Sequence, residues 1–399
     1  MDFSAPPQGW DRSGLPGWAY FNEELLELEI EELFRKRWQL ACHVNDIPNP
    51  GDYTTFDVAT ERAIILRDQK GVLRAFHNLC RHRGSRVVGD KQGNCPGALV
   101  CPYHGWTYNL DGTLRAPAKP RSFPPLDPVA WGLKPVEMEI WQGFVFIRFK
   151  PSAQPPMSQI LARYEAEVAA YRIADLVPTE PVKWTGETAV NWKSVRDVDN
   201  EGYHVPKAHP ALQDLYGKGY RDEPFQDGAA RSFAPFNEGP ARFWSVRAYR
   251  SILPEASWLP ESNRKAWVYI GLFPNAVIGL YPDSVMFYQE VPDGVGRARL
   301  RGQVYRHKAE SRALRAARYL SGRIDGVTGA EDQELTIWSY EATQSSGYEG
   351  ILLSDLEYGV KTYHDELRQV MPVLTLDQEP ARGTLIERNA EMLAEGVIA

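Results

Sequence analysis

The 399-residue sequence predicts an α+β protein, in which a small all-β domain precedes a larger domain built on an antiparallel sheet. Three observations support this prediction. Short apolar runs broken by turn residues fill positions 51–149, which is typical of a β-rich domain. The segment "KPSAQPPMSQ" at 150–159 then interrupts the chain with proline and serine. Beyond it, helical patterns and long strand-like runs indicate a second core.

Residues 1–40 are predicted to form an N-terminal arm and one helix. The arm is rich in proline and glycine. The helix, "NEELLELEIEELFRKRW", begins with Asn22 as N-cap, has acidic residues in its first turns and basic residues near its end, as the helix dipole favours. We expect this helix to pack on the larger domain.

Residues 41–155 form the predicted all-β domain. Its first predicted strands are "GDYTTFDV", "RAIILRD" and "VLRAFHN", which are separated by turn residues. The segment "TYNLDGTLRAP" is typical of a hairpin around Asp111-Gly112, and "GFVFIRF" is the last predicted strand.

Residues 156–399 form the predicted larger domain. The segment 157–173 has a helical pattern, and residues 266–292 and 298–307 are predicted strands of an antiparallel sheet. Three further helices are expected, over 310–320, 330–344 and 354–371.

Composition excludes several classes of protein. The formal net charge of -7 argues against nucleic-acid binding, which needs clustered Lys and Arg. The sequence has no apolar run of the roughly 18 residues that a membrane span needs, and its N-terminus shows no secretory pattern. Its four cysteines are too few for a disulfide framework. We therefore expect a cytoplasmic protein with no membrane or nucleic-acid partner.

Two short segments pair a cysteine with a histidine. Cys80 and His82 form Cys-x-His, and Cys101 and His104 form Cys-x2-His after an interval of 18 residues. Thiolate and imidazole ligands suit a tetrahedral zinc site, and they equally suit a [2Fe-2S] cluster with cysteines on one iron and histidines on the other. The spacing alone leaves both possibilities open.

The other two cysteines are interpreted as structural. Cys95 lies between the two motifs but has no histidine at motif spacing. Cys42 precedes His43 but belongs to no paired motif.

A second pair of histidines, His204 and His209, lies in "NEGYHVPKAHP". Residues five apart do not share a face of a continuous helix, so Pro206 is expected to end a helical turn and let His209 return to the same centre. Two imidazoles and one carboxylate form the facial triad of non-haem Fe(II) oxygenases. By itself His-x4-His is a weak motif.

The chain resembles the oxygenase component of Rieske non-haem iron oxygenases, the ring-hydroxylating oxygenase α-subunit family. "CRHRG" and "CPYHGW" are similar to the two loops of a Rieske domain, and "NWK" followed by "EGYHVPKAHP" is similar to the iron-binding segment. The resemblance implies a Rieske [2Fe-2S] domain, held by Cys80, His82, Cys101 and His104, joined to a helix-grip-like catalytic domain with a mononuclear Fe(II).

The resemblance also assigns roles in the catalytic domain. It implies that His204, His209 and Asp332 bind the iron. Glu331 and Glu334 compete with Asp332, because an acidic helix is more often a solvated face. It further implies that Glu201, three positions before His204, bridges the two metal centres by accepting hydrogen bonds from His204 and from His104 of a neighbouring chain.

The implied function is hydroxylation, with O2 as cosubstrate, of a small aromatic or amine substrate, by mono- or cis-dihydroxylation. An alternative is oxidative N- or O-demethylation of a methylated compound, including quaternary ammonium compounds. The implied partners are a reductase fed by NAD(P)H, with or without a ferredoxin, and two further copies of the chain in a homotrimer. Hypotheses from other classes are a Rieske electron carrier without oxygenase activity and a zinc-stabilised interaction protein.

Overall fold

The computed structural model describes residues 6–180 and 183–396, and these form two compact units. The large unit comprises the chain up to Glu29, Ile160–Arg172 and the chain from Leu176 onward. The small unit comprises Ile30–Gln159 and Ile173–Asp175.

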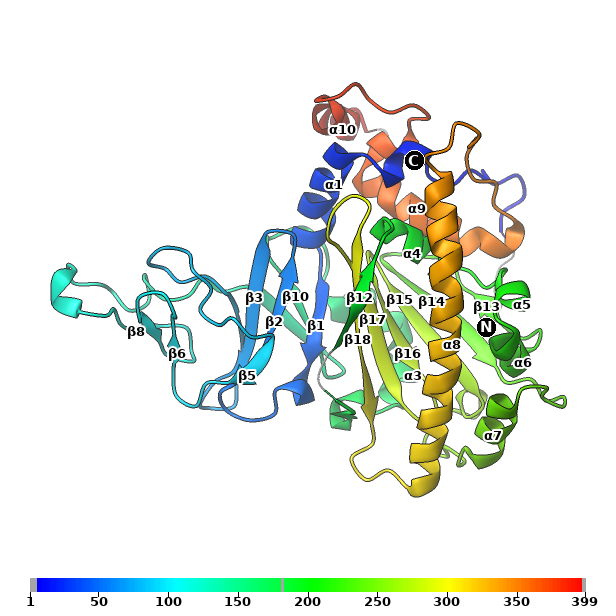
Figure 1. Ribbon diagram of the computed structural model, residues 1–399, viewed down its shortest axis with the longest axis horizontal. Coiled ribbons are helices and arrows are strands. Elements are labelled where there is room, and N and C mark those ends of the chain that lie inside the picture. Colours follow the sequence, from blue (N-terminus) through cyan, green and yellow to red (C-terminus); the bar gives the residue numbers. More distant parts are fainter. Residues whose placement is uncertain (1–5, 181–182, 397–399) are drawn as a thin grey trace. The chain divides into compact units, whose positions relative to one another are not determined.

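The large unit is built on one antiparallel sheet, which confirms the predicted α+β class (Figure 1). Its strand order is β11-β18-β17-β16-β15-β14-β13, and β12 also pairs with β18. The strands are β11 (Val177–Pro178), β12 (Lys183–Thr188), β13 (Arg221–Asp222), β14 (Ala229–Pro235), β15 (Ala266–Leu272), β16 (Ala276–Leu280), β17 (Val285–Pro292) and β18 (Ala298–Arg306). The predicted strands over 266–292 and 298–307 are therefore present.

Helices of the large unit pack around this sheet, and Figure 1 shows α8 lying across it. They are α1 (Glu23–Glu29), α3 (Glu165–Ala169), α4 (Trp192–Asp199), α5 (Val205–Ala208), α6 (Pro210–Tyr216), α7 (Trp244–Ile252), α8 (Arg312–Ala342), α9 (Tyr358–Val370) and α10 (Leu385–Ala394). The prediction of separate helices over 310–320 and 330–344 is wrong, because α8 is continuous. Glycines at 322, 326 and 329 weaken helix propensity, but packing against α4, α6 and α7 holds the helix together.

The small unit contains three antiparallel sheets, with strand orders β1-β10-β9, β4-β3-β2-β5 and β6-β7-β8. The strands are β1 (Gln39–His43), β2 (Asp52–Val58), β3 (Glu61–Arg67), β4 (Leu73–His77), β5 (Gln92–Asn94), β6 (Leu99–Val100), β7 (Thr107–Tyr108), β8 (Leu114–Ala116), β9 (Glu137–Trp141) and β10 (Phe144–Arg148). The predicted hairpin around Asp111-Gly112 joins β7 to β8.

Short helices complete the chain. The helix α2 (Met157–Ile160) stands at the boundary of the units. The 3₁₀ turns are η1 (Gly17–Tyr20), η3 (Val44–Asp46), η4 (Pro120–Ser122), η5 (Ala162–Tyr164), η6 (Ile173–Asp175), η7 (Glu261–Asn263), η8 (Asp355–Glu357) and η9 (Pro372–Thr375).

The predicted N-terminal helix is divided between the two units. Asn22 caps α1 as expected, since its side chain accepts a hydrogen bond from the Leu25 amide at 2.7 Å. From Ile30 the helix continues as a π-helix, η2 (Ile30–Arg35), which belongs to the small unit. Arg35 pairs there with Glu61 at 2.8 Å. The second half of the predicted helix is therefore part of the small unit.

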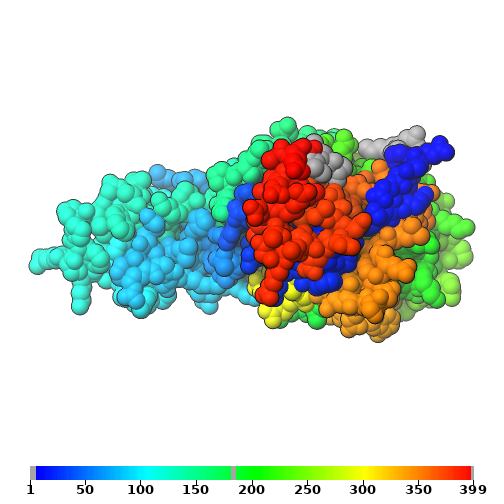
Figure 2. Space-filling model, turned by 90° about the horizontal axis from the view of Figure 1, so that it is seen from above, coloured from blue at the N-terminus to red at the C-terminus, as the bar shows by residue number. Residues whose placement is uncertain are grey.

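The N-terminal arm lies against the C-terminal part of the large unit. Figure 2 shows the blue N-terminal segment beside the orange segment that follows α8. Arg12 pairs with Asp355 at 2.6 Å, and Ser13 forms an isolated antiparallel bridge with Leu352. The arm is therefore part of the large unit.

A buried ion pair joins α1 to α4. Glu29 accepts hydrogen bonds from Lys193 Nζ at 2.5 Å and from Trp192 Nε1 at 2.8 Å, and neither charged side chain of the pair is exposed. We expect Glu29→Ala to destabilise the large unit by about 3–5 kcal/mol, because Lys193 would stay buried without its partner. Urea unfolding followed by circular dichroism measures this loss. The exposed Glu27→Ala variant serves as control, and equal unfolding midpoints for the two variants would contradict the prediction.

Candidate functional site

The two Cys/His segments fold into matching loops. In the first loop Cys80 O accepts from the Gly84 amide at 2.9 Å, and in the second Cys101 O accepts from the Gly105 amide at 3.0 Å. Both glycines have positive φ, +74° and +71°, a conformation that other residues rarely adopt. Each loop therefore presents one thiol and one imidazole in a similar backbone frame.

The donor atoms of these loops fit a metal cluster. The side chains of Cys80 and Cys101 are buried, and the rings of His82 and His104 lie 4.7 Å apart. His82 Nδ1 is buried and has no hydrogen-bond partner among the residues described. A buried imidazole nitrogen left in this way is costly unless it binds a metal or a further group. Thiols and imidazoles match the donor set of a Rieske cluster.

Tyr108 and Trp106 support this candidate cluster site. Tyr108 Oη lies 3.3 Å from Cys80 Sγ and accepts from the Arg81 amide at 2.8 Å. With its acceptor side used by Arg81, the Tyr108 hydroxyl is free to donate to the sulfur. Trp106 is buried and stacks on the His82 ring at 5.2 Å, so it packs in the core. No sequence motif had pointed to Tyr108.

The remaining cysteines lie outside these loops. Cys95 follows β5 and is half-buried, and its amide donates to Gly51 O at 2.8 Å. Cys42 is buried within β1. Next to it, His43 Nε2 lies 3.1 Å from Ile173 O, and burial lowers the pKa of His43 to about 4. Their structural interpretation stays a prediction.

His204 and His209 are brought together by a break between two short helices. His204 caps the start of α5, and His209 lies between α5 and α6 with φ -122° and ψ 75°. The expectation that Pro206 ends the turn is wrong, because Pro206 lies in the first turn of α5. The break falls at His209 because Pro210 disfavours helical backbone at the residue before it.

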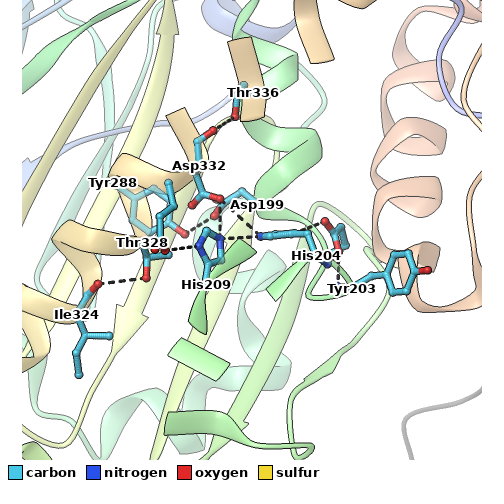
Figure 3. Close-up of polar contacts among 11 residues, drawn as sticks. Asp199, Tyr203, His204, His209, Tyr288, Ile324, Thr328, Asp332 and Thr336 are labelled. Carbon is cyan, nitrogen blue, oxygen red and sulfur yellow. Dashed lines mark hydrogen bonds and ion pairs between the residues drawn. The ribbon is translucent and has the colours of Figure 1, made fainter. Parts of the chain in front are cut away.

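Three donor atoms of the large unit converge on one point (Figure 3). His204 Nε2 lies 3.1 Å from His209 Nε2, and Asp332 Oδ1 lies 2.8 Å from His209 Nε2 and 3.6 Å from His204 Nε2. Figure 3 shows Asp332 pointing from α8 toward the two imidazoles. The three atoms lie within 4.8 Å of one another and could hold a metal ion.

Two further carboxylates contact the opposite nitrogens of these imidazoles. Glu201 Oε1 contacts His204 Nδ1, and Glu331 Oε2 lies 2.9 Å from His209 Nδ1. A carboxylate accepts, so each Nδ1 carries the proton. The lone pairs of both Nε2 atoms then face Asp332 Oδ1. Three acceptors so close together repel one another unless a cation lies between them, which fits a metal site.

The charges around the imidazoles change their proton affinity. Burial by itself lowers the pKa of His204, but the hydrogen bond and charge of Glu201 outweigh it, so the pKa is raised. Burial also opposes the rise at His209, where Asp332 raises the pKa. A metal ion and a proton therefore compete for each Nε2.

The neighbouring acidic residues of α8 differ in what they contact. Of the alternatives to Asp332, Glu331 contacts the far side of His209, and Glu334 is exposed. The contact of Glu331 was not foreseen from the sequence.

The converging atoms lie on the wall of a cavity of about 520 Å³. Helices α4, α6 and α8 and the sheet line it. Besides Glu201 and Asp332, six residues with carboxyl side chains line the cavity: Glu187, Asp199, Asp222, Glu223, Glu290 and Asp325. The basic lining side chains among the residues described are Arg196 and Arg301. Carboxyl side chains therefore outnumber guanidinium groups in the cavity lining.

Comparison with known proteins identifies the family. The family described as "Ring hydroxylating alpha subunit (catalytic domain)" matches residues 174–373, half of the chain. The chain belongs to the ring-hydroxylating alpha subunit family. The family "Rieske [2Fe-2S] domain" matches residues 37–130. The resemblance seen in the sequence is confirmed, and the two matches imply a Rieske [2Fe-2S] cluster, a mononuclear iron and O2 as cosubstrate.

Two relatives are oxygenase subunits of monooxygenases. The glycine betaine monooxygenase oxygenase subunit of Pseudomonas aeruginosa is 34% identical over 198 residues, which cover 50% of this chain and 45% of the relative. The carnitine monooxygenase oxygenase subunit of Escherichia coli is 33% identical over 216 residues, or 53% and 56% of the two chains. The chain thus spans about half the length of these curated relatives.

A solved structure shows the same fold. The structure of a quaternary ammonium Rieske monooxygenase aligns with a TM-score of 0.76 and 23% identity, over 90% of this chain and 95% of the other.

Over residues 6–180 and 183–396, no helix has the length and apolar character needed to cross a membrane.

Tyr108 leads to a testable prediction about the cluster. A hydrogen bond to a cluster sulfur stabilises the reduced state, so Tyr108→Phe is expected to lower the midpoint potential. A hydrogen bond of about 1–1.5 kcal/mol corresponds to roughly 40–60 mV for one electron. Redox titration followed by EPR measures the shift. Tyr103→Phe is the control, because Tyr103 is exposed and its hydroxyl bonds to Arg83; an unchanged potential in Tyr108→Phe would contradict the prediction.

Proposed function

We propose that the protein is the oxygenase component of a Rieske non-haem iron oxygenase system. One observation supports this most strongly: His204 Nε2, His209 Nε2 and Asp332 Oδ1 converge on the wall of a cavity large enough for a small organic molecule. Two imidazoles and a carboxylate on one side of a metal leave its other positions open. A pure electron carrier has no use for such a site.

The proposed residue roles follow from the contacts. His204, His209 and Asp332 hold the iron, and Cys80, His82, Cys101 and His104 hold the cluster. Glu201 and Glu331 fix the orientation and the Nδ1 proton of the two iron histidines. When bound, the iron would supply activation of O2 and the cluster would supply electrons one at a time.

The cavity supports an amine over a carboxylate-bearing aromatic substrate. Its acidic side chains outnumber its basic ones, and Arg196 is already paired with Asp199 at 2.6 Å. The relatives named above act on glycine betaine and carnitine, both of which carry a quaternary ammonium group. We therefore infer monooxygenation of an alkylated amine, with N-demethylation following from hydroxylation of an N-methyl group. Mono- or cis-dihydroxylation of a small aromatic compound is the second candidate, supported by the aromatic side chains in the cavity.

The proposed partners are a reductase, with or without a separate ferredoxin, and further copies of the chain. In the proposed homotrimer, the cluster of one chain serves the iron of the next. Glu201 would then accept a hydrogen bond from His104 of the neighbouring chain.

Metal analysis and oxygen uptake test the proposed function together. The anaerobically purified protein is expected to contain about three irons and two acid-labile sulfides per chain, with a Rieske-type EPR signal after reduction. With a surrogate reductase and NAD(P)H, oxygen uptake should depend on an added alkylated amine. About two irons per chain, without substrate-dependent uptake, would instead support an electron carrier. A colourless zinc protein would support the zinc-stabilised interaction protein.

A further inference from the structure

Asp325 lines the same cavity as the candidate iron site. It lies on α8 seven residues before Asp332, which is close to two full helical turns, so the two side chains share a face of the helix. Both side chains lean toward the helix N-terminus, which keeps the two carboxyl groups roughly 10 Å apart along the axis. A small organic molecule could contact both ends of this interval.

A chain of tyrosine hydroxyls ends on Asp325. Tyr281 Oη donates to Asp325 Oδ1 at 3.0 Å, Tyr269 and Tyr281 hydroxyls lie 2.8 Å apart, and Tyr216 and Tyr269 hydroxyls lie 2.7 Å apart. Each hydroxyl has one proton. The Tyr281 hydroxyl uses its one hydrogen in the bond to Asp325. The Tyr269 hydroxyl must therefore donate to Tyr281, and the Tyr216 hydroxyl must donate to Tyr269. The whole chain is therefore polarised toward the carboxylate.

Asp325 differs from three other acids of the cavity in its partners. Asp199 and Glu290 both pair with Arg196, at 2.6 and 3.7 Å. Asp222 accepts from the Ser232 hydroxyl at 2.6 Å and from the Tyr220 hydroxyl and the Gly202 amide. For Asp325, Tyr281 is the hydrogen-bond donor found within the described part of the chain, and no ion pair accompanies it there.

The surroundings of Asp325 make its negative charge costly. Burial raises the pKa of Asp325 to about 8, the Tyr281 hydroxyl opposes that rise, and the negative charge of buried Asp283 adds to it. A cation in the cavity would offset this cost. The tyrosine rings add to the attraction, since aromatic faces attract cations.

Two glycines line part of the helix surface between the two acids. Gly326 and Gly329 line the cavity on α8, and a Cβ built at either position meets no atom within 4 Å. Figure 3 shows Thr328 between Ile324 and Asp332 along this helix. The two glycines leave room for bulky groups, such as the alkyl substituents of an ammonium nitrogen, beside the helix.

We propose that Asp325, together with Tyr281, Tyr269 and Tyr216, binds the positively charged nitrogen of an alkylated ammonium substrate. This inference rests on the proposed oxygenase function and names the group that selects its substrate. The carboxylate supplies charge and the tyrosines supply rings and orientation. Arg196 and Arg301 stay engaged with Asp199 and Gln289, the latter at 3.2 Å.

Calorimetric titration of the holoprotein tests the proposal with three probes. Choline and benzyltrimethylammonium carry the charge, and 3,3-dimethyl-1-butanol is the uncharged isostere of choline. We expect at least one cation to bind saturably and the isostere to bind at least tenfold more weakly. Asp325→Asn should weaken binding of that cation at least tenfold while leaving the isostere unchanged. The exposed Glu334→Gln variant on the same helix removes an equal charge and should bind like the unaltered protein.

Three outcomes would overturn the proposal. They are the lack of saturable binding of both cations, equal affinities for choline and its isostere, and unchanged cation affinity in Asp325→Asn. The Tyr281→Phe variant provides a second test, because it removes the hydroxyl bonded to Asp325 while keeping the ring. Its cation affinity should fall between those of the unaltered protein and Asp325→Asn.

Iron content and oxygen uptake, measured in parallel, separate this proposal from the proposed function. If the unaltered protein and Asp325→Asn convert an uncharged aromatic compound equally well, the role of Asp325 is overturned and the oxygenase function is kept. If cations bind tightly at Asp325 but the protein has neither mononuclear iron nor turnover, the oxygenase function is overturned and the role of Asp325 in cation binding is kept.

Discussion

Replacing Asp332 by alanine is expected to abolish turnover while leaving the [2Fe-2S] cluster intact. Asp332 Oδ1 supplies the third converging donor, and its loss leaves only two imidazoles to hold the iron. Iron analysis should fall from about three to about two atoms per chain, with the reduced EPR signal of the cluster unchanged. Oxygen uptake in the presence of substrate should fall to background.

The neighbouring acids provide the controls for this prediction. Glu334→Ala removes an exposed carboxylate two residues away on the same helix and should retain full iron and activity. If Asp332→Ala keeps three irons per chain, Asp332 is not the ligand. Coexpression with a Cys101→Ser chain extends the test to the assembly. Each variant alone should be inactive, and mixed oligomers should regain activity only if electrons cross from one chain to the next.

Replacing Glu201 by glutamine is expected to keep both metals and to lower turnover by roughly 10- to 100-fold. Glu201 is buried, Oε1 contacts His204 Nδ1, and Oε2 accepts from the Tyr203 amide and from the His204 amide at 3.1 Å. All three partners are donors. A glutamine amide group is itself a donor, so one of these contacts must become repulsive.

Single-turnover kinetics provide the decisive measurement for Glu201. The cluster is reduced first, and its reoxidation is followed after mixing with O2 and substrate. Slow reoxidation in Glu201→Gln, with normal iron content, would match a role between the metal centres. Glu238→Gln, an exposed carboxylate of the same unit, is the control. Full turnover in the Glu201 variant would rule out the bridging role.

Local motifs could be interpreted correctly from the sequence. Cys80 and Cys101 each lie four residues before a glycine with positive φ, so their loops form from contiguous residues. The first strands of the small unit also follow from short apolar runs between turn residues. Local turns and pleats depend on near neighbours, which the sequence displays directly.

Asp332 and Asp325 illustrate what local patterns could not show. Asp332 was selected through the family resemblance, since an acidic helix alone is more often a solvated face. Asp325 was missed because glycines at 322, 326 and 329 made α8 look like two helices. In a continuous helix, the interval of seven residues would have placed Asp325 on the same face as Asp332.

The sequence by itself determined the α+β class, the two Cys/His loops and the His204–His209 pair, because each depends on residues close together in the chain. Only the tertiary structure decided that Asp332 and Glu331 contact His209 from α8, and that Tyr216, Tyr269 and Tyr281 form one chain ending on Asp325. These side chains come from separate helices and from the region of the sheet, and packing of the elements around one cavity sets their distances. Sequence periodicity shows which face of an element is apolar, but not which distant element that face will meet.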